Sequence, residues 1–128
     1  TLDEAREDKL AELAAVAGIY DQYKCDEMYV VSSLGRKANS DSRSITNMRG
    51  LITQLDDKAT TQYKDYDNAF HEVTKAQLTT LKDECVKNGQ ALYQQKWAYQ
   101  TKINEAKTVD EIKAITFEFT MADFSKKA

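Results

Sequence analysis

The sequence predicts an α+β fold that is predominantly helical, with four helices and two small antiparallel β hairpins. Proline is absent and only four glycines occur in 128 residues, so few positions interrupt a helix. Apolar residues recur at helical spacing over most of the chain. Two short segments, near residues 28–38 and 61–73, instead combine aromatic and β-branched residues with turn formers, which is typical of hairpins.

The first helix is predicted over residues 2–20. Thr1 and Glu4 have the spacing of a capping box, in which two side chains satisfy free backbone N–H groups at a helix start. Its apolar residues share one face: Leu10, Leu13, Ala17 and Tyr20. A strand over residues 27–32, a turn at 33–35 and a second short strand at 36–38 should follow.

The second helix is expected to begin near Asn39–Asp41, whose side chains are good caps, and to end near Asp56–Asp57. Its apolar stripe is Ile45, Met48, Ile52 and Leu55. Residues 61–73 then read as strand, turn and strand, with Asp and Asn residues in the turn at 65–68.

The third helix is predicted to be the longest, from about residue 75 to 106, and central to the core. Thr74 and Gln77 form a second capping box. The pair Asn88-Gly89 is typical of a helix end, but the apolar phase continues across it, so one continuous helix is expected. Two adjacent stripes are predicted to be buried: Leu78, Leu81, Cys85, Leu92, Tyr99 and Ile103, and then Val86, Tyr93 and Trp97.

A short last helix should begin at a third capping box, Thr108–Glu111, and carry Val109, Ile112, Ile115 and Phe119. Beyond it, Phe124 is expected to dock on the core and Lys126-Lys127 to fray.

Length, charge and hydropathy restrict the class of protein. A chain of 128 residues fits one domain, and a first residue other than Met is compatible with a fragment of a longer protein. No apolar run is long enough to span a bilayer, and the acidic N-terminus is unlike a secretory signal. The net charge is −3, whereas nucleic-acid binders usually carry a basic footprint. Neither a membrane nor a nucleic acid is therefore expected as a partner.

No motif for metal, cofactor or catalytic chemistry is complete. His71-Glu72 begins like a zinc motif, but Lys75 stands where the second histidine belongs. Asp65 begins a stretch like a calcium loop that lacks the required glycine and glutamate. The sequence therefore predicts no enzyme, no cofactor and no metal site.

His71 and the two cysteines are expected to have structural roles. His71 lacks a visible orienting partner as a general base, and we expect it to support a turn or sheet edge. Cys25 and Cys85 are expected to be two thiols and not a disulfide, with Cys85 packed on a helix face.

A candidate contact surface is placed at the two hairpins. Residues 34–54 are locally basic, with Arg36, Lys37, Arg43 and Arg49 against Asp41. We interpret these basic residues as the solvent-exposed face of a helix in preference to a binding site for an anionic partner. Tyrosine gives large contact area at small entropic cost, and Tyr63 and Tyr66 flank a turn. The candidate contact residues are Arg36, Lys37, Tyr63 and Tyr66.

Three ordered segments carry a family resemblance. They are Val30-Val31-Ser32-Ser33-Leu34-Gly35 with Asn39-Ser40-Asp41 and Ser44; Tyr66-Asp67-Asn68-Ala69-Phe70 with Thr74 and Leu78; and Lys96-Trp97 with Ile103–Ile112, Ala114 and Ile115. Together they resemble a domain of unknown function found in phage and prophage tail proteins, often near the end of tail-fibre or fibre-assembly polypeptides.

The resemblance implies a non-catalytic structural or assembly domain, associated with a tail fibre or baseplate. Its implied partner is a phage tail or tail-fibre protein, with a homo-oligomer left open. Its implied location is the virion tail, or the host bacterial cytoplasm during assembly, and the chain would be a C-terminal fragment of a longer tail protein. Residues 103–115 are also similar to the last helix of bacterial albumin-binding modules, which implies a host-protein or cell-surface binding module as the alternative.

Overall fold

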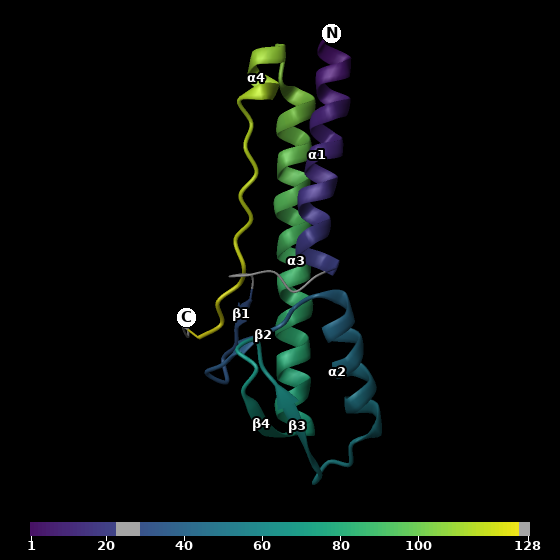
Figure 1. The fold of residues 1–128 in the computed structure, drawn as a ribbon, viewed down its shortest axis with the longest axis vertical. Coiled ribbons are helices and arrows are strands. Elements are labelled where there is room, and N and C mark those ends of the chain that lie inside the picture. The colour runs from purple at the N-terminus through teal and green to yellow at the C-terminus, as the bar shows by residue number, and fades with distance from the viewer. Residues whose placement is uncertain (23–28, 126–128) are drawn as a thin grey trace.

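A single long helix forms the axis of the molecule. The computed structural model describes residues 1–22 and 29–125. The elements in chain order are α1 (Leu2–Gln22), β1 (Val30–Val31), β2 (Lys37–Ala38), α2 (Ser42–Gln54), β3 (Thr60–Lys64), β4 (Phe70–Thr74), α3 (Lys75–Glu105) and α4 (Val109–Lys113). α1 lies beside the half of α3 that leads to its C-terminus, whereas α2 and the two hairpins surround the other half (Figure 1). The predicted α+β class, dominated by helix, is confirmed.

The helices begin where the capping residues predict. The Asp41 carboxylate accepts from the Ser44 N–H at 3.1 Å, and Thr74 forms a complete capping box at the start of α3. Thr108 Oγ1 accepts from the Glu111 N–H at 3.1 Å. The end of α2 is earlier than expected. It stops at Gln54 because Leu55 is extended and its N–H already bonds to the preceding turn.

Both predicted hairpins are present as two-stranded antiparallel sheets. β1 pairs with β2, and β3 pairs with β4 in a register that places Tyr63 opposite His71. Gly35 and Asn68 take positive φ values of 81° and 66° in the two turns, a conformation that glycine and short polar side chains tolerate. Residues 27 and 28 of the expected first strand lie outside the described residues, as do Cys25 and the final lysines.

α3 is continuous through Asn88-Gly89, as predicted. The second stripe of this helix was expected to be buried, and that expectation is wrong for its aromatic members. Tyr93 is 52% exposed and Trp97 is 56% exposed. They lie away from the helix face where Gln95 and Tyr99 bond to the end of the chain.

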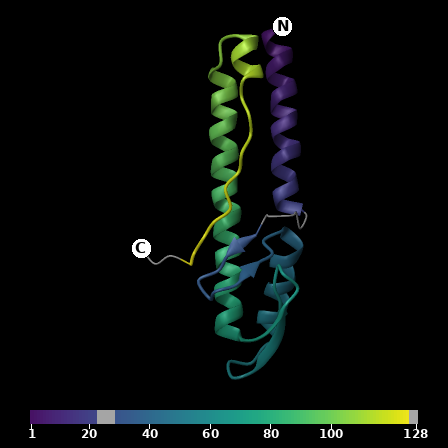
Figure 2. The same cartoon turned by 60° about the vertical axis from the view of Figure 1, so that its left-hand side comes forward.

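The end of the chain is extended where a helix was expected. α4 stops at Lys113, so Ile115 and Phe119 do not belong to it. Residues 115–124 form a C-terminal arm that runs back between α1 and α3 (Figure 2). Inward and outward residues alternate along the arm, with Ile115, Phe117 and Phe119 inward and Thr116, Glu118 and Thr120 exposed. A period of two belongs to a strand and not to a helix.

Hydrogen bonds fix the arm along its length. Gln95 exchanges two hydrogen bonds with the Thr120 backbone, at 3.0 and 2.8 Å. Tyr99 Oη does the same with the Glu118 backbone, at 2.9 and 3.0 Å. The arm ends beside β1, where the Phe124 N–H donates to the Val31 carbonyl at 2.8 Å.

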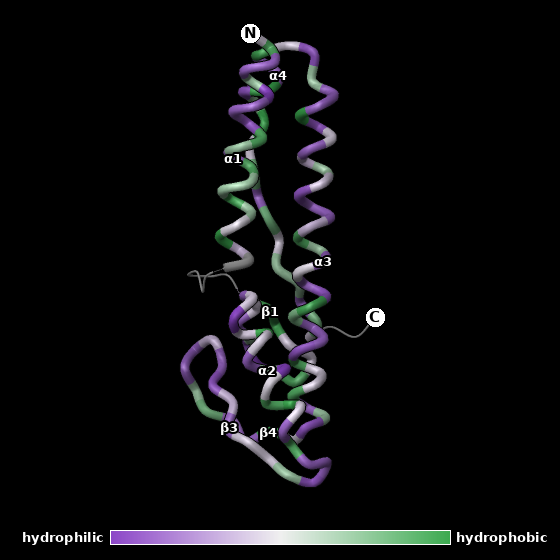
Figure 3. Tube along the Cα trace, turned by 90° about the vertical axis from the view of Figure 1, so that its right-hand side faces the viewer, coloured by the Kyte–Doolittle hydropathy of each residue, from purple (hydrophilic) through white to green (hydrophobic). Residues whose placement is uncertain are grey.

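Two apolar clusters lie at different heights along α3. The hairpin cluster joins α2, the hairpins and α3, and its buried members are Val30, Ala38, Met48, Tyr63, Val73, Leu78, Leu81 and Cys85. Phe124 packs against this cluster, as expected. The arm cluster joins α1, α3 and the arm around Leu13, Ile103 and Ile115. Along α1 and α3 hydrophobic and hydrophilic residues alternate, as in helices that bury one face (Figure 3). Among the described residues, no helix is long and apolar enough to cross a membrane.

Candidate contact surfaces

The two hairpins meet at the expected contact residues Lys37 and Tyr66. The Tyr66 N–H donates to the Lys37 carbonyl at 3.0 Å. Tyr29 lies between the two side chains: its ring centroid is 5.0 Å from that of Tyr66, and Lys37 Nζ is 4.4 Å from it. All three residues are half-buried. The junction is therefore a small aromatic and cationic surface, stabilised by a cation–π contact.

Tyr63 does not lie on this surface. It is only 9% exposed and belongs to the hairpin cluster, so its expected exposure is corrected. The register of β3 and β4 places its ring on the inward face, beside Val73. Burial raises the pKa of Tyr63 above its ordinary value. Arg36 is half-buried, and its Nη1 atom is buried without a hydrogen bond to any described residue.

His71 has an orienting partner that the sequence did not reveal. Its Nε2 lies 2.6 Å from Asp65 Oδ2, and the other oxygen of that carboxylate accepts from the Ala69 N–H at 2.9 Å. Burial by itself raises the pKa of Asp65, but the hydrogen bonds from His71 and Ala69 outweigh it, and the net pKa is lowered. The pair closes the turn between β3 and β4, so the predicted turn-supporting role of His71 is confirmed.

A buried polar cluster attaches β1, β2 and the arm to α3. Glu84 accepts from the Ser32 hydroxyl at 2.6 Å and from the Ser33 N–H. Asn88, one turn further along, donates to Ser40 Oγ at 3.3 Å and accepts from the Ala122 N–H at 2.8 Å. In the sequence, this cluster is indicated by two polar residues, Glu84 and Asn88, that lie four positions apart among the apolar residues of α3.

Cys85 is a free, fully buried thiol within the same stretch of α3. Burial raises its pKa to about 12. Its Sγ lies 3.5 Å from the Asn39 carbonyl, to which the thiol donates. The expectation of a packing thiol is confirmed for Cys85.

The most exposed aromatic side chains lie elsewhere. Tyr93 and Trp97 are neighbours on α3, with ring centroids 6.1 Å apart. Phe70, at the start of β4, is 63% exposed. Large exposed aromatic groups that are close together mark contact surfaces, whereas single ones are common on any protein. The Tyr93–Trp97 pair is therefore the stronger candidate.

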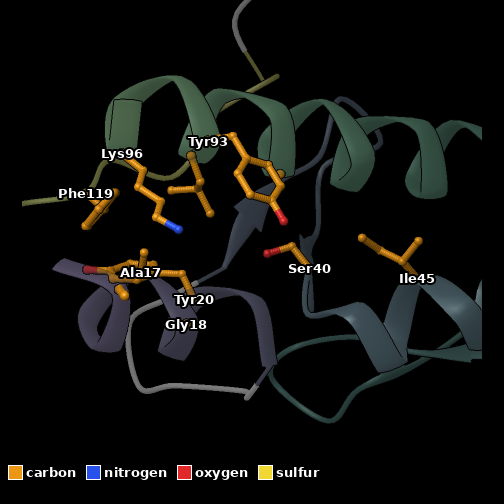
Figure 4. Close-up of a pocket in the computed structure, with 11 residues that line it drawn as sticks. Ala17, Gly18, Tyr20, Ser40, Ile45, Tyr93, Lys96 and Phe119 are labelled. Carbon is orange, nitrogen blue, oxygen red and sulfur yellow. The ribbon is translucent and has the colours of Figure 1, made fainter. Parts of the chain in front are cut away.

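A pocket of about 220 Å³ opens beside this pair, between α1, the start of α2, α3 and the arm. Lys96, Tyr93 and Ser40 point their polar ends into it (Figure 4). The other lining residues are apolar or small: Ala14, Ala17, Gly18, Tyr20, Ile45, Gly89, Leu92 and Phe119. Sequence reasoning missed this pocket because it depends on the position of the arm.

Comparison with known proteins identifies one family. No curated protein and no solved structure matches the chain. A family model described as Domain of unknown function (DUF4376) matches residues 4–120, from the first turn of α1 into the arm. This match covers both hairpins, the side chains of the buried polar cluster and the aromatic pair on α3. The chain therefore belongs to the family described as Domain of unknown function (DUF4376).

Proposed function

We propose that this domain is a non-catalytic structural or assembly component of a phage or prophage tail, associated with a tail fibre or baseplate, and that it acts through protein–protein contacts. The resemblance of three ordered segments to phage tail proteins supports the tail assignment. The observation that supports protein contact is that one of those segments includes Lys96-Trp97, which lies at the surface beside the pocket.

Most residues of the three segments are explained by the fold itself. Val30, Leu78 and Ile103 are core residues, whereas Asp41 and Thr74 cap helices. Phe70 and Trp97 are different, because they are 63% and 56% exposed. Of the two, only Trp97 adjoins a residue that lines the pocket, Lys96. Exposed tryptophan and tyrosine are enriched among the residues that dominate binding energy in protein interfaces. A role in protein contact therefore explains the presence of Lys96-Trp97 in these segments better than a role in stabilising the fold does.

A co-purification experiment tests the proposal. The tagged domain is expected to recover a tail or tail-fibre polypeptide encoded beside it, and replacing Tyr93 and Trp97 together by alanine should reduce recovery at least about tenfold. Phe70→Ala is the matched control, because it removes an equally exposed aromatic ring outside this surface. Recovery of no tail protein, together with absence of the domain from purified particles and from assembly intermediates in the host cytoplasm, would contradict the tail role.

The alternative, an albumin-binding module, gains no support from the geometry. The similar residues, 103–115, form no single helix, because α3 ends at Glu105 and α4 begins at Val109. Titration with serum albumin distinguishes the two proposals, and we expect no binding.

A further inference from the structure

We propose that the pocket beside Tyr93 binds an apolar side chain with a nearby carboxylate, presented by a polypeptide partner. The inference rests on the proposed contact function and assigns a chemistry to it. It follows from the shape of the pocket, from the polar groups inside it and from the apolar surface that continues outside it.

Two glycines leave room for a side chain. Gly18 of α1 and Gly89 of α3 both line the pocket, and a Cβ atom added to either would meet nothing within 4 Å. The remaining surface is largely aliphatic and aromatic, with Leu92 and Phe119 among its residues. An inserted apolar group would therefore exchange water for apolar contacts, which is favourable.

The polar groups in the pocket favour an anion. The Lys96 ammonium group forms no ion pair with any residue that the structure describes. The Ser40 hydroxyl accepts from Asn88, which leaves its own proton to donate. The Tyr93 hydroxyl points into the same space (Figure 4). Among the residues that the structure describes, no carboxylate lines the pocket, so three donors, one of them charged, face this site without a described acceptor of opposite charge.

The surroundings favour a polypeptide over an isolated small molecule. A volume of about 220 Å³ is smaller than that of typical ligand pockets, which begin at about 300 Å³. Apolar surface continues beyond the pocket on Trp97, whose ring lies against Tyr93. A partner that inserts one side chain and extends over Trp97 uses both features, and its carboxylate is either an acidic side chain or a C-terminus.

The four glycines of the chain provide an internal test. N-acetylphenylalanine carries an aromatic ring and a free carboxylate, and its binding is followed by the backbone amide signals of the glycines in a ¹⁵N–¹H spectrum. We expect saturable shifts for Gly18 and Gly89, which line the pocket, and none for Gly35 and Gly50, which do not. The neutral analogue N-acetylphenylalaninamide should bind about tenfold more weakly. Unchanged signals, equal shifts of all four glycines or equal affinity for the two compounds would overturn the proposal.

Matched variants separate charge from shape. Lys96→Gln should make the acid and the amide bind equally, whereas Lys87→Gln, an exposed change on the same helix outside the pocket, should not. Gly89→Leu should fill the pocket and abolish the shift of Gly18. Gly50→Leu places the same side chain on α2, where an added Cβ also meets nothing within 4 Å, and should bind like the parent.

Failure of this inference is distinguishable from failure of the tail role. If Gly89→Leu recovers the tail polypeptide as well as the parent does, the pocket is not the contact site and this inference fails alone. If the acid binds in the pocket but no tail polypeptide is recovered, the pocket chemistry stands and the tail assignment fails.

Discussion

Asp65 shows how one buried carboxylate organises a turn. It is 5% exposed, and its two oxygens bond to His71 and to the Ala69 N–H across the loop that joins β3 to β4. These bonds compensate the cost of removing the charge from water. They also hold the loop in the conformation that brings Tyr66 to Lys37 at the hairpin junction.

Asp65→Asn should therefore change both stability and its dependence on pH. The lowered pKa means that the carboxylate stabilises the fold above its unfolded-state pKa of about 3.9, and that this contribution is lost as pH falls through the folded-state value. We expect the variant to lose about 1–3 kcal/mol of unfolding free energy at pH 7. Below about pH 5 its stability should fall less steeply than that of the parent. Urea unfolding at several pH values measures both effects.

The control for this prediction lies in the same turn. Asp67 is exposed, so Asp67→Asn should change unfolding free energy at pH 7 by no more than about 0.5 kcal/mol. A parent and an Asp65→Asn variant that lose stability in parallel toward acid would show that this carboxyl has no special role.

At the scale of elements, the arm is where sequence reasoning and structure diverge. Capping residues located α2, α3 and α4 because a cap is a local interaction between neighbours. The arm follows a capped helix start, and Ile112, Ile115 and Phe119 also fit a helical spacing. The alternation of Ile115, Phe117 and Phe119 with polar residues fits a strand equally well. Packing against α1 and α3 decides between them, and that packing is not local.

The candidate contact residues show the same distinction between local and non-local interactions. Lys37 and Tyr66 were correctly assigned to the hairpins, but their proximity depends on a bond between the two hairpins. Tyr63 lies on β3, whose pairing with β4 places its side chain on the buried face, whereas Tyr66 lies in the turn that follows the strand. The aromatic pair was predicted to be buried because periodicity identifies an apolar stripe without showing whether another element covers it.

Phe119→Ala tests the contribution of the arm. The Phe119 ring centroid lies 5.1 Å from that of Tyr20 and 5.6 Å from that of Tyr99, so the side chain joins the arm to α1 and to α3. We expect a loss of about 2–4 kcal/mol in unfolding free energy, measured by chemical denaturation. Phe70→Ala should cost no more than about 0.5 kcal/mol, because that ring is 63% exposed. Equal losses in the two variants would show that the arm adds little to stability.

At the scale of the whole molecule, α3 connects the two clusters, and the arm, with Phe119 packed on one and Phe124 on the other, is a second link between them. The hairpin cluster includes Leu78 and Leu81, near its start, and the arm cluster includes Ile103, near its end. Unwinding of α3 in its middle would remove the helical link between the two halves. Continuity of α3 at Gly89 is therefore expected to make the two halves unfold together.

Gly89→Ala tests this coupling. The added methyl group meets no neighbouring atom, and alanine favours a helix interior over glycine by about 1 kcal/mol. We expect one cooperative transition, with the same increase in midpoint when unfolding is followed by fluorescence of Trp97 and by far-ultraviolet circular dichroism. Trp97, the single tryptophan, reports on α3 beyond Gly89, whereas the dichroism signal averages over all helices. Two separate midpoints, with only one of them raised, would show that the halves unfold independently.

The arm also determines when the fold can form during synthesis. Asp123 pairs with Val31, and the Arg6 guanidinium donates to the Ala106 carbonyl, 100 positions along the chain. The arm residues that complete the packing around Leu13 and Val30 are thus made after both of them. At translation rates of about 5–20 residues per second, these early apolar residues lack the cover of the arm for about 5–20 s in each nascent chain. For that interval a chaperone, or a partner protein made at the same time, has access to surfaces that the completed domain withdraws from solvent.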